Sequence, residues 1–308
     1  MVRGGAIGDF VLTLPALHAL RGSSDQLAVL GSSAVAPLAV AGDLADEWRS
    51  LEGREWASWF VADGTCDPKT TAWLADFDTV VSYLHDPDGA FERNLKNIKQ
   101  LRYVSGEHKP SGKPMTETLA EPLQELGVMQ CDEPFRLEVP REQLPWPGNW
   151  LAVHPGSGSE RKNWAEENWK NLFARINKET DWNILLIGGE AEAGRIDRLA
   201  ADLPSTRVSK ADGWPLVRLA GTLANCTLFA GVDSGIRHLA EAVGLGLAPA
   251  DVVALIAMIG LASFLPISIA GFGTREGLLF WGLSLRGVPD SLELAIAYSG
   301  FFFVFCFL

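Results

Sequence analysis

The sequence predicts an α/β protein with two Rossmann-like units and an apolar tail. Short apolar runs alternate with helical stretches along most of the chain, a pattern typical of βαβ units around a parallel sheet. A proline-rich stretch separates two such series, and charged residues become rare after the second. We therefore expect one unit over residues 1–138, a linker over 139–150, a second unit over 151–244 and the tail over 245–308.

The 308-residue chain is acidic, with 26 Lys and Arg residues against 38 Asp and Glu residues and a net charge of −12. This balance argues against a nucleic-acid partner, because phosphate contacts need clustered Lys and Arg side chains. The cysteines lie far apart and show no CxxC spacing, so we expect neither a disulfide framework nor a zinc site, and a reducing compartment fits best. They are Cys66, Cys131, Cys226 and Cys306.

The tail accounts for a mean hydropathy of +0.10, which is high for so acidic a chain. Residues 245–308 hold only two basic and four acidic residues. Within them, Val252–Thr274 runs for 23 residues without a charge, longer than the ~20 residues that cross a bilayer core, and Leu294–Leu308 is also uncharged. We expect a membrane-spanning segment here; a buried helix of a globular domain is the alternative.

In the first unit, a tight loop at Gly4–Gly8 leads into a predicted helix over Phe10–Arg21. Only three residues stand before this loop, too few for a buried strand, so we expect a shortened first strand. The other predicted elements are strands at Leu27–Leu30, Thr79–Tyr83, Trp150–His154, Asn183–Ile187 and Thr227–Val232, and helices at Ala45–Leu51, Met115–Leu126, Ala165–Lys178, Glu190–Leu203, Leu216–Ala224 and Ile236–Val243.

The first candidate site is the glycine-rich loop Gly4–Asp9. Its glycines allow a ligand to approach the backbone closely, and the N-terminus of the following helix favours negative charge there. We expect Gly8 and Asp9 at the mouth of the sheet, with the Asp9 carboxylate as a general base. An aspartate that only caps the helix is the alternative.

Two further loops follow predicted strands of the second unit. In His154–Trp164, the N–H groups of Gly156–Ser159 and the Lys162 ammonium suit a phosphate; a polar surface loop is the alternative. In Asp233–His238, the helix N-terminus suits a diphosphate, and His238 either reaches the same anion or makes a structural hydrogen bond. Two anion-binding loops at strand ends of one domain favour nucleotide binding.

Four motifs follow one another along the chain: GAIGDFVLTLPALHALR at Gly5–Arg21, LAVHPGSGSERKNWAEENWKNLF at Leu151–Phe173, ILLIGGEAE at Ile184–Glu192, and LAGTLANCTLFAGVDSGIRHLAEAVG at Leu219–Gly244. Over residues 2–244 the chain thereby resembles glycosyltransferase family 9, the ADP-heptose:lipopolysaccharide heptosyltransferases. The resemblance implies a GT-B fold and transfer of a sugar from a nucleotide-sugar donor to a lipopolysaccharide core or similar lipid-linked saccharide. Inversion, no metal or cofactor, and a place at the cytoplasmic face of the bacterial inner membrane are implied as well.

The resemblance also implies roles for individual residues. Asp9 matches the family's proposed catalytic base, which would take a proton from the acceptor hydroxyl, so that Gly8 and Asp9 would lie near the acceptor. Lys162 matches the lysine that contacts the donor phosphates. Glu192 matches an acidic residue that binds the donor ribose. The other donor-binding residues that it implies are Ser157 in the phosphate loop, and Asp233, Ser234, Gly235 and His238 of the D-[ST]-G-x-x-H motif.

The C-terminal part departs from this family. After the predicted helix at Ile236–Val243 the family continues with a strand, a loop and closing helices, which this chain lacks, so we expect the second domain to be incomplete. Leu265–Pro289 instead resembles the membrane domain of the lysylphosphatidylglycerol synthase or flippase-like family, where Arg275 and Glu276 would be costly in lipid. The alternatives are a membrane-integral protein of that type with a degenerate nucleotide-binding module, or an inactive chimera of two reading frames.

Overall fold

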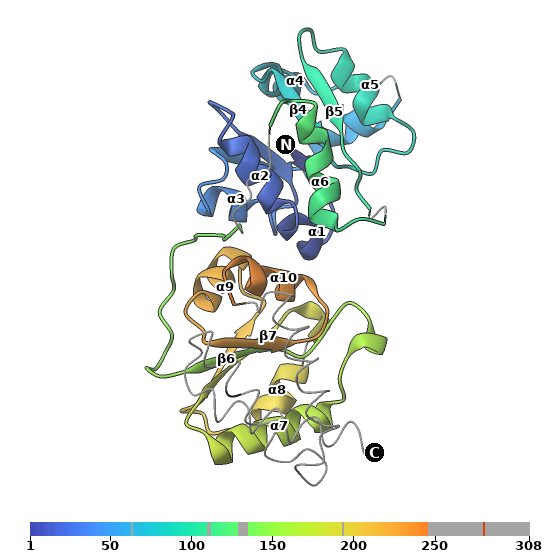
Figure 1. Ribbon diagram of the computed structural model, residues 1–308. Helices are drawn as coiled ribbons and strands as arrows, with labels where there is room; N and C mark the ends of the chain where they lie inside the picture. The colour runs from blue at the N-terminus through green and yellow to red at the C-terminus, as the bar shows by residue number, and fades with distance from the viewer. Residues whose placement is uncertain (63, 110–111, 129–134, 193, 246–279, 281–308) are drawn as a thin grey trace. The chain divides into compact units, whose positions relative to one another are not determined.

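The computed structural model describes residues 1–62, 64–109, 112–128, 135–192, 194–245 and 280 (Figure 1). The chain divides into two compact units. The first comprises Met1–Arg141 with Pro215–Gly221, and the second comprises Glu142–Trp214 with the described residues from Thr222 onward. Each unit contains its own parallel sheet.

The first unit has a five-stranded parallel sheet in the order β3-β2-β1-β4-β5. Its strands are β1 (Val2–Arg3), β2 (Ala28–Gly31), β3 (Glu47–Ser50), β4 (Thr79–Ser82) and β5 (Arg102–Ser105). Its helices are α1 (Ile7–Val11), α2 (Leu14–Arg21), α3 (Pro37–Ala41), the 3₁₀ helix η1 (Arg54–Phe60), α4 (Pro68–Ala75), α5 (Ala90–Lys96) and α6 (Met115–Gln124). The predictions of β2, β4 and α6 are confirmed.

The short first strand is buried, contrary to the expectation that three residues are too few. Val2 and Arg3 are each 2% exposed. Val2 pairs with Leu30 on β2 and with Ser82 on β4, so that β1 has a backbone partner on either side. A strand in the middle of a sheet can be short because both of its edges are hydrogen-bonded.

One helix prediction in this unit is wrong, and another is confirmed only in part. The segment Ala45–Leu51 contains strand β3, which pairs in parallel with the whole of β2. Short apolar patterns do not separate helix from strand, and here the pairing with β2 decides. The predicted helix Phe10–Arg21 is divided between α1 and α2, and Pro15 lies in the first turn of α2, where a missing N–H group costs nothing.

A cluster of aromatic side chains fills one side of the first sheet. Trp56 and Trp59 are at most 1% exposed and pack with Trp73 and Phe91. The Trp59 Nε1–H group donates to Thr70 Oγ1 at 2.8 Å, so that its polar edge is satisfied as well. Burial of each such side chain stabilises the fold by about 1.5–3 kcal/mol, which gives the first unit a core of its own.

The second unit has a four-stranded parallel sheet in the order β8-β7-β6-β9. Its strands are β6 (Trp150–His154), β7 (Asn183–Gly188), β8 (Val208–Asp212) and β9 (Leu228–Gly231). Its helical elements are the 3₁₀ helices η2 (Glu160–Lys162) and η3 (Glu190–Glu192), with α7 (Glu166–Glu179), α8 (Arg195–Ala200), α9 (Leu216–Leu223, shared with the first unit) and α10 (Gly235–Ala242). Helices α7 and α8 cover one face of the sheet and α10 the other (Figure 1).

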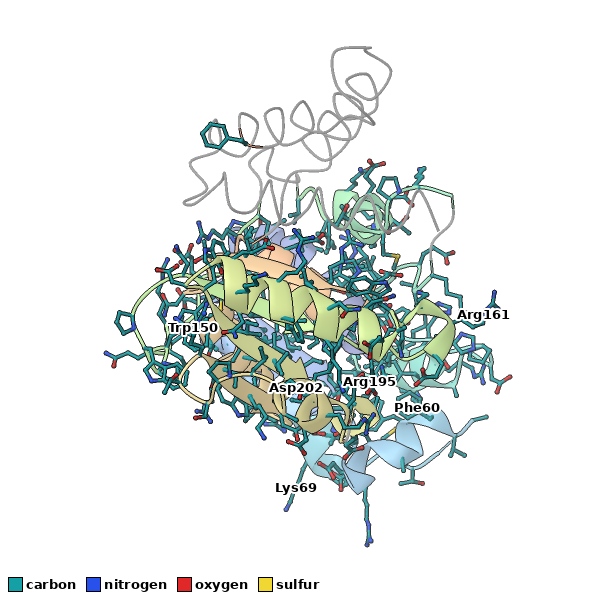
Figure 2. The ribbon with its side chains drawn as sticks, turned by 90° about the horizontal axis from the view of Figure 1, so that it is seen from below. Phe60, Lys69, Trp150, Arg161, Arg195 and Asp202 are labelled. Atoms are coloured by element: carbon teal, nitrogen blue, oxygen red, sulfur yellow. The ribbon has the colours of Figure 1, made fainter. Side chains whose placement is uncertain are left out.

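The central strands of this unit are buried along their whole length. All residues of β6 and β7 are buried, as continuous apolar runs in parallel sheets are. Trp150 at the start of β6 and Arg161 in the loop that follows lie at opposite ends of the unit (Figure 2). The predictions of β6, β7, β9, α7, α9 and α10 are confirmed, whereas β8 was not predicted.

The predicted helix at Glu190–Leu203 is interrupted. Its first residues form η3, and α8 begins only at Arg195. Between them Gly194 takes a φ of +76°, a left-handed conformation that glycine adopts at little cost and that ends a helix. The interruption separates Glu192 from α8 and leaves it directly beyond the end of β7.

The apolar tail lies outside the described residues except for Leu245 and Phe280. No helix within the described part of the chain combines the length and the apolar character that a membrane span requires. The predicted spans at Val252–Thr274 and Leu294–Leu308 are therefore not described by the structure.

Candidate functional site

Strands β6 and β9 bring two of the predicted loops to the same edge of the second sheet. The strands are neighbours in parallel register, with His154 opposite Gly231. The loops that follow them therefore leave from adjacent carboxyl ends, the position where open α/β sheets bind ligands. One loop carries Lys162 and the other carries Asp233.

Lys162 and Asp233 form an ion pair across this edge, with 2.7 Å between Nζ and Oδ2. Arg237 Nη1 lies 3.7 Å from the other oxygen of the same carboxylate. The hydrogen bond and charge of Lys162 lower the pKa of Asp233, and Arg237 contributes to the same shift. Both side chains of the Lys162–Asp233 pair are more than half exposed, and exposed pairs of this kind contribute only about 0–1 kcal/mol, so an anion can compete for the lysine.

Helix α10 begins at this pair. Ser234 is its N-cap residue, and the Ser234 hydroxyl accepts a hydrogen bond from the Arg237 N–H group at 3.4 Å. Gly235 is the first residue of the helix. His238 lies one turn further on, where its Nδ1 is 3.3 Å from Glu241 Oε2. The structure thus gives His238 a partner on its own helix, the alternative considered for this residue.

Ser157 stabilises the loop after β6 from within. The Ser157 hydroxyl is 2.9 Å from the Ser159 carbonyl oxygen and 3.0 Å from Asn163 Oδ1, and it accepts from the Ser159 N–H group at 3.3 Å. Only 9% of the residue is exposed. Ser157 therefore positions the loop that carries Lys162.

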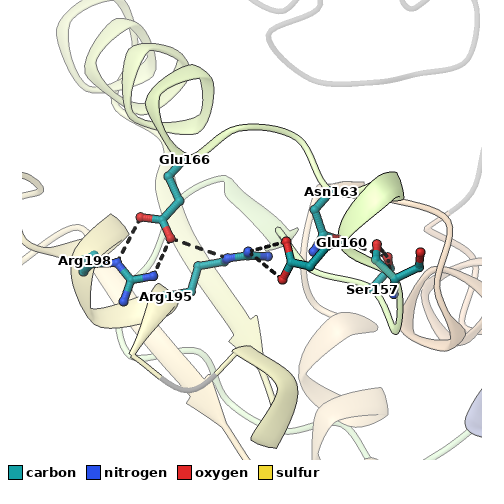
Figure 3. A network of polar contacts seen from close by, with 7 residues as sticks. Ser157, Glu160, Asn163, Glu166, Arg195 and Arg198 are labelled. Atoms are coloured by element: carbon teal, nitrogen blue, oxygen red, sulfur yellow. Dashed lines mark hydrogen bonds and ion pairs between the residues drawn. The ribbon is translucent and has the colours of Figure 1, made fainter.

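An ion-pair network that the sequence analysis missed ties this loop to α7 and α8 (Figure 3). Arg195 lies between Glu160, at 3.3 Å, and Glu166, at 3.6 Å. Arg198 also pairs with Glu166, and these contacts lower the pKa of the Glu166 carboxyl. Because α8 begins with Arg195 only after the interruption at Gly194, the unbroken helix expected from the sequence concealed this arrangement.

Glu192 lies under the same loop and is buried, with 6% exposed. Its Oε2 accepts a hydrogen bond from the Gly189 N–H group at 3.0 Å. A Cβ atom at Gly156 would overlap the Glu192 carboxylate, so the loop packs against it only because residue 156 is glycine. The structure thus brings Glu192 to the loop that carries Lys162.

His154 was not singled out from the sequence, although it ends β6 beside this carboxylate. It is 5% exposed, and its Nδ1 lies 3.0 Å from the Ile187 carbonyl oxygen. Burial lowers the pKa of His154, while the hydrogen bond to Ile187 and the charge of Glu192 act in the opposite direction. The imidazole therefore joins the ends of β6 and β7 below the loop.

In the first unit, Asp9 lies on α1 next to the glycine-rich loop. Its Oδ2 accepts a hydrogen bond from the Ala6 N–H group at 3.0 Å, and 48% of its side chain is exposed. Gly8 precedes it in the same helix, and Gly5 has a φ of +106°, which favours glycine. Asp9 is not the N-cap residue of the alternative, because Ala6 holds that position and Asp9 bonds back to it from the third helical position. The carboxylate thus supports the start of the helix and still presents an accessible face.

A cavity of about 550 Å³ lies at the opposite edge of the first sheet. It is lined by residues at or before the amino ends of the strands, including Met1, Leu27, Asp78 and Arg102. Asp9 follows the carboxyl end of β1, so this cavity does not contain the candidate base. Within the described ranges, no group of three or more His, Cys, Asp or Glu side chains is arranged to hold a metal ion.

Comparison with known proteins bears on the activity. Residues 119–247 match the model of glycosyltransferase family 9 (heptosyltransferase). Lipopolysaccharide heptosyltransferase 1 of Pseudomonas aeruginosa is 28% identical over 284 residues, which cover 79% of this chain and 75% of that protein. The family match ends at residue 247, and the flippase-like resemblance of the tail gains no support from these proteins.

Solved structures bear on the fold. A family 9 glycosyltransferase from Veillonella parvula has a TM-score of 0.61 at 15% identity, covering 79% of this chain and 78% of that chain. The E. coli heptosyltransferase WaaC, solved with ADP-2-deoxy-2-fluoro heptose, has a TM-score of 0.60 at 18% identity, covering 79% and 84%. The fold is therefore GT-B-like, with parallel sheets, as predicted. The chain is therefore a glycosyltransferase, and its residues 119–247 are similar to glycosyltransferase family 9 (heptosyltransferase).

Proposed function

We propose that this glycosyltransferase moves heptose from ADP-heptose to a lipopolysaccharide core or a similar lipid-linked saccharide, with inversion and without a metal ion. The donor half of the proposal rests on the ion pair between Lys162 and Asp233. This pair lies at adjacent strand ends, beside the N-terminus of α10. The E. coli relative solved with an ADP-heptose analogue and the Pseudomonas relative named for lipopolysaccharide support the choice of donor and acceptor.

On the donor side, the diphosphate takes Asp233's place as the partner of Lys162. The Lys162 ammonium and the N–H groups of Ser234 and Gly235 then stabilise the negative charge that develops on the departing diphosphate. Glu192 binds the ribose hydroxyls, and Ser157 stabilises the loop that carries Lys162. His238 donates a hydrogen bond to the diphosphate. This charge stabilisation supplies what a metal ion would otherwise provide.

On the acceptor side, Asp9 acts as the general base. The acceptor hydroxyl oxygen attacks the anomeric carbon of the donor sugar, its proton passes to the Asp9 carboxylate, and the bond from the anomeric carbon to the diphosphate oxygen breaks. ADP leaves with that electron pair, and the sugar's configuration inverts because the attack comes from the opposite face. The Asp9 carboxylate suits this task, because it is partly exposed and lies beside the glycine-rich loop, whose backbone a substrate can approach closely.

The donor half is tested with ADP as the probe and isothermal titration calorimetry as the measurement. Lys162→Ala is expected to weaken ADP binding by about 10- to 100-fold, because a charge-assisted hydrogen bond contributes about 1.5–3 kcal/mol. Lys210→Ala is the matched control, since Lys210 forms an ion pair of the same 2.7 Å length with Asp197 on the surface of the same unit. Equal ADP affinity in both variants would remove Lys162 from the donor site.

The reaction itself is tested by incubating the full chain with ADP-heptose and a heptose-free lipid A–core acceptor. The expected product is the acceptor with one added heptose, detected by mass spectrometry, with and without EDTA. ADP binding with no transfer to this acceptor would leave the donor site standing and overturn the proposed acceptor. Loss of transfer in EDTA would overturn the metal-independent mechanism.

We also propose that the enzyme works at the cytoplasmic face of the inner membrane, with the tail as its anchor. The uncharged run Val252–Thr274 supports this, and a lipid-linked acceptor would lie in the same membrane. After expression, the full chain is expected in the membrane fraction and resistant to extraction by high salt or alkaline carbonate. Recovery in the soluble fraction would contradict the anchor without affecting the donor site.

A further inference from the structure

Arg3 is a buried arginine directly before the glycine-rich loop. It is 2% exposed and forms the last residue of β1, between β2 and β4. Arginine keeps its charge in proteins and is rarely fully buried unless it is paired. The partners of the Arg3 guanidinium therefore indicate which parts of the first unit its buried charge holds in place.

The Arg3 guanidinium reaches two segments of the first unit. Its Nε and Nη2 donate to the Asp9 carbonyl oxygen at 3.4 and 3.3 Å, and its Nη1 donates to the Tyr83 carbonyl oxygen at 3.2 Å. The same group lies over the Tyr83 ring, 5.9 Å from its centroid. Arg3 thereby joins helix α1 to the segment that follows β4.

The guanidinium also faces the Asp9 side chain. Arg3 Nη2 is 3.8 Å from Asp9 Oδ1, while Asp9 Oδ2 accepts from the Ala6 N–H group. Each carboxylate oxygen thus has a separate partner, and the side chain is held in one orientation. Burial lowers the pKa of Arg3, and the nearby Asp9 charge offsets part of that effect.

We infer that Arg3 is a positioning residue for the Asp9 base, which rests on the proposed role of Asp9 in transfer. Arg3 holds α1 through the Asp9 carbonyl group, and its guanidinium faces one oxygen of the carboxylate and keeps it oriented. The Ala6 N–H group binds the other oxygen, and 48% of the Asp9 side chain remains exposed. Arg3 itself touches no reacting atom.

The test compares Arg3→Met, Arg3→Lys and Asp9→Asn in the full chain. Heptose transfer from ADP-heptose to the lipid A–core acceptor gives kcat and acceptor KM, ADP titration gives Kd, and thermal unfolding gives Tm. Arg3→Met is expected to lower kcat by about 100-fold, as misplaced catalytic groups do, with the Kd of ADP unchanged. Arg3→Lys keeps the charge and is expected to recover part of the loss.

A double variant shows whether the two residues act together. Asp9→Asn with Arg3→Met is expected to be no slower than Asp9→Asn alone, because Arg3 acts through that carboxylate. Multiplied losses would overturn the inference. So would full kcat in Arg3→Met when Asp9→Asn is inactive, whereas an active Asp9→Asn variant would overturn the proposed base itself.

Thr13→Val separates positioning of the carboxylate from support of the helix. The Thr13 hydroxyl donates to the same Asp9 carbonyl oxygen at 2.7 Å, which is a contact with the backbone of Asp9. Its loss is expected to lower Tm and to leave kcat close to that of the unaltered chain. An equal fall of kcat in Thr13→Val and Arg3→Met would show that only support of α1 matters. If Arg3→Met does not fold, the same comparison is made with Arg3→Lys.

Discussion

The lack of a side chain at Gly156 allows the loop after β6 to pack closely against Glu192. The residue lies in the loop after β6, directly against the buried Glu192 carboxylate, which the Gly189 N–H group holds in place. A Cβ atom there would come within 2.5 Å of Glu192 Cγ, closer than packed carbon atoms approach. At this position, therefore, the absence of a side chain brings the loop and the carboxylate together.

Gly156→Ala is expected to destabilise the second unit by about 1–3 kcal/mol, the usual cost of overpacking, and to weaken ADP binding. Urea unfolding and ADP titration measure the two effects. Gly158→Ala is the control in the same loop, because nothing lies within 4 Å of the position of its Cβ atom. Equal behaviour of the two variants would contradict the packing argument.

Among the elements, strands β2 and β3 are joined at their carboxyl ends by Glu52. Its carboxylate accepts hydrogen bonds from the hydroxyls of Ser32, Ser33 and Ser50, at 2.8, 2.6 and 3.2 Å, and from the Ser33 N–H group at 3.3 Å. The bonds from Ser33, with those from Ser32 and Ser50, lower the pKa of Glu52 to about 2. The edge strand that sequence reasoning mistook for a helix is held by this carboxylate as well as by its pairing.

Because its pKa is lowered, Glu52 contributes to the stability of the fold at neutral pH and contributes less as the pH falls. The ionised form is favoured in the folded state, so its stabilisation is present above the ordinary glutamate pKa of about 4.3 and is lost as the pH falls toward about 2. Glu52→Gln is expected to lower Tm at pH 7, and the difference from the unaltered chain is expected to shrink between pH 5 and pH 3. A difference that stays constant or grows on acidification would contradict this assignment.

For the molecule as a whole, the two units have separate hydrophobic cores. One contains the tryptophan cluster of the first sheet, and the other contains Trp169, Phe173 and Trp182 beside the second sheet. Domains with their own cores can unfold as separate cooperative units. Under the proposed function, the donor binds to the unit that contains the second of these cores.

Differential scanning calorimetry is expected to show two unfolding transitions. ADP at 100 times its Kd is expected to raise the midpoint temperature of only one transition, because under the proposed function it binds the folded second unit. The stability added to that unit is about 2.7 kcal/mol. Lys162→Ala is expected to reduce that shift, and Arg3→Lys is expected to leave it unchanged. A single transition, or an equal shift of both, would show that the units unfold together.

Most of the strands and the three loops were predictable because each depends on local chemistry. Buried parallel strands are continuous apolar runs, as in Asn183–Gly188, and glycine-rich turns mark where such strands end. The predictions failed where distant residues decide the local structure. Strand β3 exists through its pairing with β2. The break in the predicted helix after β7 has a local cause instead, because Gly194 adopts a positive φ.

The sequence by itself determined the α/β class, because alternating apolar runs and helical stretches are visible in it. It also determined where glycine, aspartate and lysine stand at strand ends, because these are properties of single residues. Only the tertiary structure decided their partners. It paired Lys162 with Asp233 and buried Arg3 under Asp9, since adjacency across a parallel sheet depends on strand order and register. Neither can be read from residues that lie far apart along the chain.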